Sequence, residues 1–218
     1  MLNMATTPGQ AARQLLRRRR YGVLSTASQK FPGYPYGSFV DYVTDQLGRP
    51  VILISALAEH THNIVHQSHV SLAVHDPGEQ AQAMPRLTLL GDARLIGPDD
   101  EHRIRDRYLR HFPEAEPYLA LDFTFYRIEP QHMRHIAGFA QAIWVSAADF
   151  LALGSRLADC EQDLLQEMQA GQKTELVGVD CDGCDVRVDG QIQRIDFAEP
   201  ALDAAAVRAQ FQALAQGK

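Results

Sequence analysis

Four histidines stand close together in one short stretch of the sequence, where their imidazoles could bind a metal. They are His60, His62, His66 and His69, and His62 and His66 are one helical turn apart. Zinc and non-haem iron sites need a further protein ligand, and neither an H-E-x-x-H motif nor a carboxylate at a recognisable spacing accompanies this stretch. The pattern is more typical of an exposed helix, although His60 and Asn63 could face a ligand as hydrogen-bond donors.

Two cysteines form a lone C-x-x-C motif, Cys181-Asp-Gly-Cys184. The central Asp-Gly favours a tight turn, so the motif predicts a β-hairpin with one cysteine on each side of its loop. A zinc ribbon would need a second pair of cysteines, and Cys160 is the single one that remains. Redox or metal chemistry is the alternative to a hairpin without chemistry.

Arginines could hold an anion at two places. The run Arg17–Arg20 ends an expected N-terminal helix, and its like charges favour a solvated helix end, with a ligand phosphate as the alternative. Arg86 and Thr88 begin a long alternating strand and share one of its faces. If that face is buried or lies at a subunit seam, Arg86 needs a carboxylate or a phosphate, because a buried unpaired guanidinium is costly.

Length and composition limit the classes of protein that could carry these residues. The chain has 218 residues, 45% of them hydrophobic and 22% charged, which suits one domain with a small addition and excludes a disulfide-stapled miniprotein or a disordered chain. The net charge of −6 argues against nucleic-acid or membrane partners. Three cysteines, no signal peptide and no apolar stretch near the roughly 20 residues that span a bilayer predict a cytoplasmic protein.

The elements that must position these residues are mostly short strands. Runs rich in β-branched and aromatic residues predict strands at 21–28, 35–44, 50–56, 69–75, 86–96, 121–128, 132–137 and 141–145. Helices are expected from Thr7-Pro8 to about Arg20, at 59–67 and from Pro98 to about His111. Because regular βα units and a Gly-rich phosphate loop are missing, the pattern favours an antiparallel barrel over a parallel sheet.

The composition changes at about Ala147. A long helix rich in Leu, Ala, Gln and acidic residues is expected there, followed by a small hairpin within 176–188 and 191–197 and a last helix from Pro200. We therefore predict two domains, a barrel over residues 1–146 and a small α+β domain over residues 147–218.

A series of motifs follows between Ala11 and Val145: LSTAS, PYGS, ISALAEHTHN, VSLAV, RLTLLG, RYLRHFPEAEPY, the DF pair with YRI, and GFAQAIWV. In this order they resemble the FMN-binding split-barrel superfamily of pyridoxamine 5′-phosphate oxidase-like proteins, and within it the haem-utilisation (HugZ-like) branch. The resemblance implies an α+β fold, a six-stranded antiparallel split β-barrel followed by a small C-terminal domain. It also implies a homodimer with its cofactor at the subunit seam.

The resemblance implies where a flavin would bind. In the oxidases, arginine and lysine grip the FMN phosphate at positions that match Ser38, Val43 and His60, so three cations are replaced here. The implied polar contacts to the cofactor are Ser38, Ser55, His60, Thr61, Asn63, Arg86 and Thr88. If Arg86 contacts the phosphate, its replacement by alanine should weaken FMN binding by about 2 kcal/mol. The Arg-Leu-His-x-Arg pattern of the true oxidases does not follow Trp144, the single tryptophan, so pyridoxal-phosphate synthesis is not implied.

The haem-degrading members imply a second set of residues. In them a histidine of the C-terminal extension is the axial ligand, near the acid of the DF pair. Asp122 matches that acid, and the ligand position falls near Cys160, whose thiolate could bind haem iron.

Together these observations predict an FMN-binding split-barrel protein, with a possible FMN-dependent oxidoreductase activity whose catalytic residues are unknown. The first alternative is a haem-binding or haem-degrading protein with haem oxygenase-like activity. A barrel that has lost its cofactor and acts as an interaction module is the third hypothesis.

Overall fold

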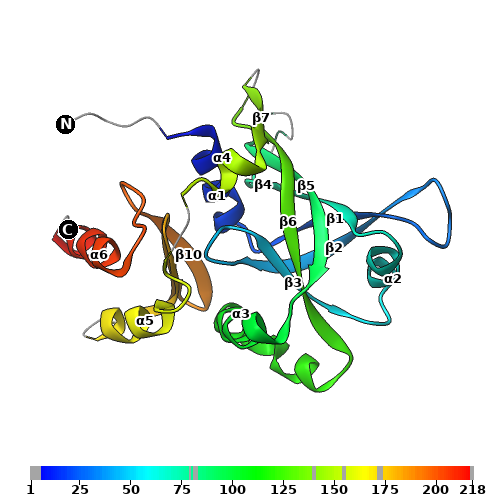
Figure 1. Ribbon diagram of the computed structural model, residues 1–218. Helices are drawn as coiled ribbons and strands as arrows, with labels where there is room; N and C mark the ends of the chain where they lie inside the picture. Colours follow the sequence, from blue (N-terminus) through cyan, green and yellow to red (C-terminus); the bar gives the residue numbers. More distant parts are fainter. Residues whose placement is uncertain are drawn as a thin grey trace.

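The polypeptide forms a β-barrel followed by a small α+β domain (Figure 1). The computed structural model describes residues 6–78, 80, 83–138, 141–153, 156–170 and 174–216. The barrel region contains α1 (Pro8–Arg18), β1 (Tyr21–Ala27), β2 (Pro35–Thr44), β3 (Pro50–Ser55), α2 (Glu59–His66), β4 (His69–His75), β5 (Arg86–Leu95), α3 (Pro98–His111), the 3-10 helix η1 (Pro113–Ala120), β6 (Phe123–Ile136), β7 (Ala142–Ser146) and α4 (Ala147–Leu151). The C-terminal domain contains α5 (Glu161–Gln169), β8 (Glu175–Asp180), β9 (Gly183–Val188), β10 (Gln191–Asp196) and α6 (Ala204–Gln216). Within these ranges, no helix is long and apolar enough to cross a membrane.

Six antiparallel strands close the barrel in the order β3-β2-β1-β4-β5-β6, with β6 returning to pair with β3. Strand β6 is long enough to pair with two strands along one edge, β3 through residues 123–127 and β7 through residues 132–136, while its other edge pairs with β5. The register of β5 shifts between Leu90 and Gly91, a bulge at which a side chain would collide with the carbonyl of Glu129. The predicted antiparallel split barrel is confirmed.

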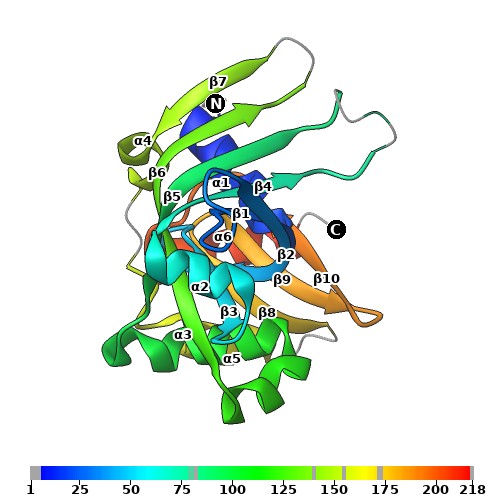
Figure 2. The ribbon, with the colours of Figure 1, turned by 90° about the vertical axis from the view of Figure 1, so that its right-hand side faces the viewer.

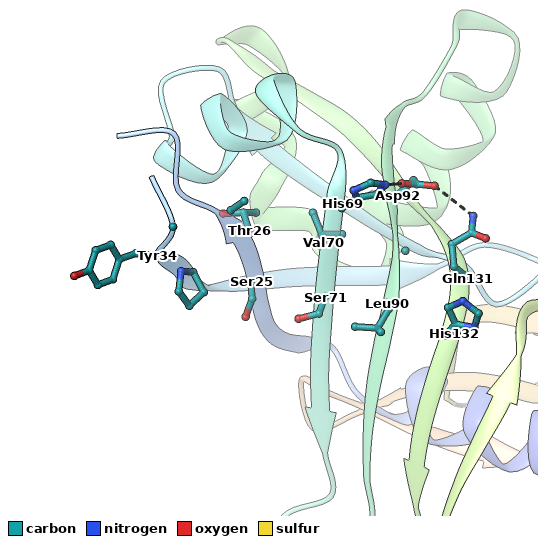
Figure 3. Close-up of a pocket in the computed structure, with 14 residues that line it drawn as sticks. Ser25, Thr26, Tyr34, His69, Val70, Ser71, Leu90, Asp92, Gln131 and His132 are labelled. Atoms are coloured by element: carbon teal, nitrogen blue, oxygen red, sulfur yellow. Dashed lines mark hydrogen bonds and ion pairs between the residues drawn. The ribbon is translucent and has the colours of Figure 1, made fainter. Parts of the chain in front are cut away.

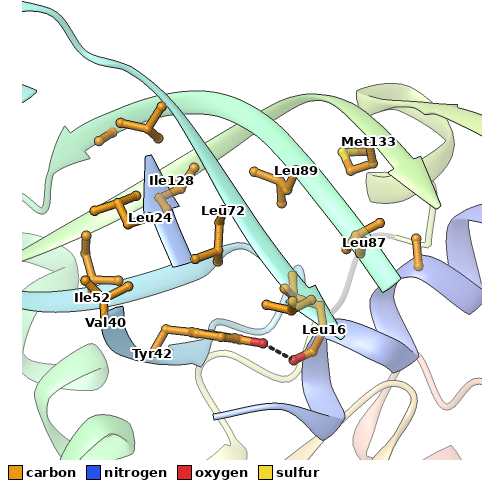
Figure 4. Close-up of a cluster of buried hydrophobic side chains, with 14 of the residues drawn as sticks. Leu16, Leu24, Val40, Tyr42, Ile52, Leu72, Leu87, Leu89, Ile128 and Met133 are labelled. Carbon is orange, nitrogen blue, oxygen red and sulfur yellow. Dashed lines mark hydrogen bonds between the residues drawn. The ribbon is translucent and has the colours of Figure 1, made fainter. Parts of the chain in front are cut away.

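Alternate residues of the strands point inward and form the barrel core (Figure 4). Leu24, Leu72 and Leu89 face one another across three neighbouring strands and are fully buried. The hydroxyl of the buried Tyr42 donates a hydrogen bond to the Leu16 carbonyl of α1 at 2.8 Å, so burial leaves this phenol satisfied. The outside of β2, β3 and the first half of β6 carries a second apolar cluster, which α3 and η1 cover.

The arginine run at the end of α1 is not the solvated helix end that its charges predict. Arg17 is 1% exposed, Arg19 and Arg20 are partly buried, and Arg18 is exposed. The physical reason is tertiary, because the β8–β9 hairpin brings carboxylates beside α1 and neutralises the repulsion within Arg17–Arg20.

A buried ion cluster joins α1 to the C-terminal sheet, which lies beside the barrel (Figure 2). Arg17 contacts Asp180 and reaches Asp182 through its Nε at 3.1 Å. Arg13 donates to Asp182 at 3.0 Å, and Arg194 donates to both oxygens of Asp180 at 2.6 and 2.7 Å. Burial opposes ionisation of Asp180, but Arg17 and Arg194 outweigh it and hold the pKa of this carboxyl well below its usual range.

The predicted hairpin is present, but its two-residue turn between β8 and β9 is Cys181-Asp182 and not the expected Asp-Gly. Cys181 therefore lies in the turn and Cys184 in β9, so the cysteines do not stand one on each side of the loop. Both cysteines of the motif are buried and free. Burial raises the pKa of Cys181 to about 11 and that of Cys184 to about 12, so both thiols are protonated at neutral pH.

The long helix expected from Ala147 is not formed. Two shorter helices, α4 and α5, occupy this region, and residues 156–160 before α5 are not helical. Phe150 of α4 is buried in the barrel core, whereas Leu164 and Met168 of α5 are buried in the core of the C-terminal domain. One straight helix could not bury both apolar faces in two different cores. Helix α4 therefore packs on the barrel, although it follows the boundary predicted after residue 146.

Candidate functional site

The sheet formed by β1, β4, β5, β6 and β7 has one face that points away from the barrel core. Register places outward residues of successive strands in rows across this face. One row contains Ser25, Ser71, Leu90 and His132, and the next contains Val23, Ala73, Thr88, Arg134 and Trp144. We call this surface the outer face. The side chains of Ser25, Ser71 and Ala73 in the middle of β1 and β4 are small, so this part of the face is flat, whereas His69 and His75 stand at the two ends of β4.

A hollow of about 860 Å³ lies on the outer face, and we call it the outer groove (Figure 3). Strands β1, β4, β5 and β6 form its floor, and residues 33–35 before and at the start of β2 form one edge. Figure 3 shows Ser25, Ser71, Leu90 and His132 in a line across the groove. The row gives the groove a floor of two small hydroxyl side chains and one apolar side chain with an imidazole at its end, and His69, Asp92 and Gln131 also line the groove.

Two histidines line the outer groove, and they differ in what they contact. His69 Nε2 lies 3.4 Å from Asp92 Oδ1, and the amide nitrogen of Gln67 lies 3.3 Å from His69 Nδ1. Gln131 donates to the other oxygen of Asp92 at 3.3 Å, so the ring of His69 is held on both sides. In the part of the chain that the structure describes, no hydrogen bond or ion pair engages the exposed His132. His132 is thus the imidazole that could bind a metal centre without losing a partner.

A second hollow, of about 370 Å³, lies where β2 and β3 meet the start of α2, the end of α3 and η1. We call it the α2 pocket. At its rim, Ser55 Oγ donates to Asp122 Oδ2 at 2.7 Å and the backbone amide of Leu57 donates to the same oxygen at 3.3 Å. Ser38 Oγ lies 3.1 Å from His60 Nδ1. The structure therefore brings four predicted site residues together here, from strand ends and a helix far apart in sequence.

The ionisation of these groups follows from their surroundings. The hydrogen bond from Ser55 lowers the pKa of Asp122, which is ionised at neutral pH. Burial lowers the pKa of His60, which is neutral at the same pH. His60 Nε2 is buried and has no hydrogen-bond partner among the described residues. Its remaining nitrogen is thus available to a bound group.

The rest of the α2 pocket is aromatic and acidic. Asp41 and Glu114 line it, and no arginine or lysine does so among the described residues. The aromatic residues are Phe39, Tyr108, Phe112, Tyr118 and Phe123. Val43, a position where the oxidases carry a cation, is buried under α3. A phosphate dianion needs charge-assisted donors, so this pocket does not suit the phosphate of FMN.

Two further predicted residues lie beside the pocket, but their side chains hold α2 in place. Thr61 donates to the Ser55 carbonyl at 2.7 Å. The Asn63 amide donates to Thr26 Oγ1 at 2.9 Å and accepts from the Gln29 backbone amide at 2.8 Å. Both side chains are buried, so they tie α2 to β1 and β3 rather than pointing at a ligand.

Arg86 and Thr88 are on the outer face, where Arg86 stands opposite His75 and Ile136 in register. Arg86 also donates to the Met84 carbonyl at 3.4 Å. Neither Arg86 nor Thr88 lines the α2 pocket. One protomer therefore presents the predicted cofactor contacts in two separate places.

The two residues proposed from the haem-degrading members also lie apart. Asp122 is at the α2 pocket, whereas Cys160 precedes α5 and packs against the core of the C-terminal domain. The Cys160 thiol donates to the carbonyls of Arg156 and Leu157, both at 3.7 Å, and burial raises its pKa. In the described structure no contact joins this thiol to Asp122.

In the described structure the donor atoms of the histidine-rich stretch do not gather into a group of three or more that lie close enough to share a metal ion. His62 and His66 are exposed on α2. Among the described residues, the one group whose donor atoms lie close enough for a metal is Asp180, Cys181 and Asp182, and the ion cluster already occupies its carboxylates.

Sequence reasoning missed His132 and the pairing of His69 with Asp92. Alternation along β5 and β6 could have placed Leu90 and His132 on an outward face. Gly91 in the sequence indicates a possible bulge in this strand, but the pairing register that sets Leu90 opposite His132 is seen only in the structure.

Comparison with known proteins gives the same fold and adds ligand classes. The non-canonical heme oxygenase HOZ of Arabidopsis thaliana, a chloroplastic protein, is 38% identical over 136 residues, which are 62% of this chain and 42% of that protein. This chain thus spans less than half the length of that relative. A solved protein of unknown function from Agrobacterium tumefaciens is similar with a TM-score of 0.78 and 23% identity over 94% of both chains. A heme binding protein from Mycobacterium smegmatis is similar with a TM-score of 0.63 and 25% identity over 97% of both chains.

These likenesses confirm the split barrel and the resemblance to its haem-utilisation branch. A family profile described as "CREG, beta-barrel" matches residues 4–152, which is more than half of the sequence. The chain belongs to the CREG β-barrel family.

Proposed function

We propose that this protein binds haem in the outer groove, where the His132 imidazole would hold the iron. The observation that carries the proposal is the row of Ser25, Ser71 and Leu90 that ends at the exposed His132 imidazole. Haem needs space for a planar ring, apolar contact and a nitrogen or sulfur ligand; the two serines give the space, Leu90 the contact and His132 the nitrogen. The sequence identity with a heme oxygenase and with a heme binding protein also supports haem as the ligand.

Each residue of the groove has a role that follows from its chemistry. Ser25 and Ser71 are small enough for a planar ring to lie against the strands, and Leu90 offers apolar contact. Arg134 is two residues beyond His132 on the same face of β6 and can pair with an anionic side group. The hydrogen-bonded His69 adds a nitrogen donor at the groove. Bound haem would supply iron redox and oxygen chemistry, which the protein orients.

We further infer that the protein supports oxidative haem degradation with electrons from an external donor. The support is the 38% sequence identity with the Arabidopsis relative over 136 residues, which are 62% of this chain. FMN, the cofactor favoured by the sequence, is less well supported, because Asp41 and Glu114 line the pocket in which its phosphate was expected. The residues present do not supply the cations for that group.

A homodimer through the outer face would explain why the predicted contacts lie in two places. The face is flat along β1 and β4 and carries the exposed Trp144, which is 63% exposed and lies 5.4 Å from the Arg134 guanidinium. Pairing two such faces would set the groove at the seam and bring Arg86 and Thr88 of one protomer toward the other. Sedimentation velocity would measure the association, which Ser71→Arg should abolish.

The test of haem binding is a haemin titration followed by absorption spectroscopy, with FMN titrated in parallel. We expect a saturable Soret band in the wild type. His132→Ala should weaken haem binding at least about tenfold, on the scale of a lost metal ligand, and should shift the Soret maximum. His66→Ala is the matched control, since His66 is an exposed histidine on α2 that does not line the groove.

The outcomes separate the hypotheses. Equal affinity and an equal spectrum for His132→Ala and wild type would remove His132 as the ligand. Retention of FMN after desalting with no Soret band would return the flavin hypothesis to first place. Loss of the Soret band with ascorbate and oxygen, together with iron captured by ferrozine, would establish haem degradation.

A further inference from the structure

The α2 pocket has the opposite chemistry to the phosphate site expected at this position. Five aromatic side chains line it together with Asp41 and Glu114. The ionised Asp122 lies at its rim, where it accepts from Ser55. Carboxylates repel a phosphate dianion and attract a cation. Aromatic rings add to that attraction, because their faces carry a partial negative charge.

The aromatic side chains are held in place by one another. Tyr118 and Phe123 are stacked with ring centroids 4.9 Å apart, and Tyr108 lies 5.1 Å from Phe112. Tyr108 is 3% exposed, so its ring is anchored against the outside of the barrel. Tyr108 is therefore a buried wall of the pocket, whereas Tyr118 and Phe39 are 45% and 79% exposed and present their rings at its open side.

Among the residues that the structure describes, no ion pair involves Asp41 or Glu114, and no arginine or lysine lines the pocket. Burial and the nearby Glu114 both raise the pKa of Asp41, so the ionised form of Asp41 is disfavoured in this pocket. Burial, followed by the charges of Asp41 and Glu114, also raises the pKa of Tyr108. The His60 imidazole adds a buried nitrogen without a partner, and the Ser38 hydroxyl can donate to or accept from its other nitrogen. A bound ammonium or guanidinium group would relieve the repulsion between the carboxylates and could donate a hydrogen bond to His60 Nε2.

We propose that the α2 pocket binds an organic cation, an ammonium or guanidinium group, where flavin-binding relatives of this fold hold a phosphate. Asp41 and Glu114 supply the countercharge, and the rings of Tyr118 and Phe123 supply cation–π contact. The cationic group comes either from a small-molecule amine or from an arginine of a second copy of this chain. Both sources share one chemistry, and the experiment separates them.

The test is a titration of the full-length, ¹⁵N-labelled protein with tetramethylammonium chloride and with butylammonium chloride, with potassium chloride and sodium phosphate as reference titrations. We expect saturable shifts of backbone amides at 39–41 and 55–60 with the organic cations alone. Asp41→Asn should raise the dissociation constant about threefold or more, on the scale of one partly exposed charge. Glu116→Gln is the matched control, because Glu116 lies on the same η1 helix but lines a different hollow.

Sedimentation velocity identifies the source of the cation. If a second copy supplies it, the organic cations and Asp41→Asn will weaken self-association, and Arg86→Gln or Arg134→Gln will do the same. If a small molecule supplies it, self-association will be unchanged while the amide shifts persist. The proposal is overturned if phosphate shifts these amides and Asp41→Asn strengthens its binding. It is equally overturned if neither cation shifts them and Asp41→Asn leaves self-association unchanged.

Discussion

Replacing Arg17 by methionine should strongly destabilise the protein, because it removes one charge from the buried ion cluster. Arg17 is 1% exposed and pairs with the fully buried Asp180 and Asp182. Breaking a buried ion pair by removing one member costs about 3–5 kcal/mol. Arg194 still makes two hydrogen bonds to Asp180, and Arg13 still makes two to Asp182. The cost should therefore lie near the lower limit, at about 3 kcal/mol.

For a chain of this size, a loss of about 3 kcal/mol corresponds to a fall of roughly 6–12 °C in the melting temperature. Urea unfolding followed by far-UV circular dichroism would measure the free energy of unfolding. Arg18→Met is the matched control in the same arginine run, because Arg18 is exposed and donates to the Gln14 carbonyl within its own helix. Its cost should be within about 0.5 kcal/mol. Equal effects of the two substitutions would refute the assignment of Arg17 to a buried cluster.

Three further outcomes follow from the structure. The pKa values of Asp180 and Asp185 are lower in the folded than in the unfolded chain, since guanidinium groups outweigh the effect of burial. Their contribution to stability is therefore present above about pH 4 and is lost on acidification. The urea midpoint should fall between about pH 5 and about pH 3, and a midpoint that does not change over this range would contradict the prediction. Cys181 and Cys184, with pKa values of about 11 and about 12, should react with iodoacetamide at neutral pH only after denaturation, as mass spectrometry would show. Gly91→Ala should destabilise the barrel by about 1–3 kcal/mol, because its side chain would collide with a carbonyl of β6, and an unchanged melting temperature would exclude this clash.

Local patterns in the sequence were sufficient for the fold. Alternating apolar residues in the strands and the turn residues between them predict antiparallel pairing, and Gly91 marks the bulge that the structure contains. The order of the motifs then indicates the split barrel. These features are local because side-chain alternation and turn formation depend on neighbours a few residues away.

The candidate sites could be predicted only in part. Ser38, Ser55 and His60 were found from the motifs and do meet at the α2 pocket. The sign of the charge in that pocket could not be predicted, because Asp41 and Glu114 come from different elements and meet only after α3 and η1 cover β2 and β3.

The sequence by itself determined most of the strands and the barrel that they form, although the two strands predicted at 121–128 and 132–137 are the single strand β6. Only the tertiary structure decided which charged residues are buried and with which groups they pair. Arg17 is buried rather than solvated because a hairpin more than 160 residues away in the chain supplies its carboxylates. His132 stands at the end of the outer groove because strand register, including a bulge, aligns it with Leu90. Strand register and long-range charge pairing depend on which distant segments of the chain come into contact. The spacing of residues along the sequence does not specify those contacts.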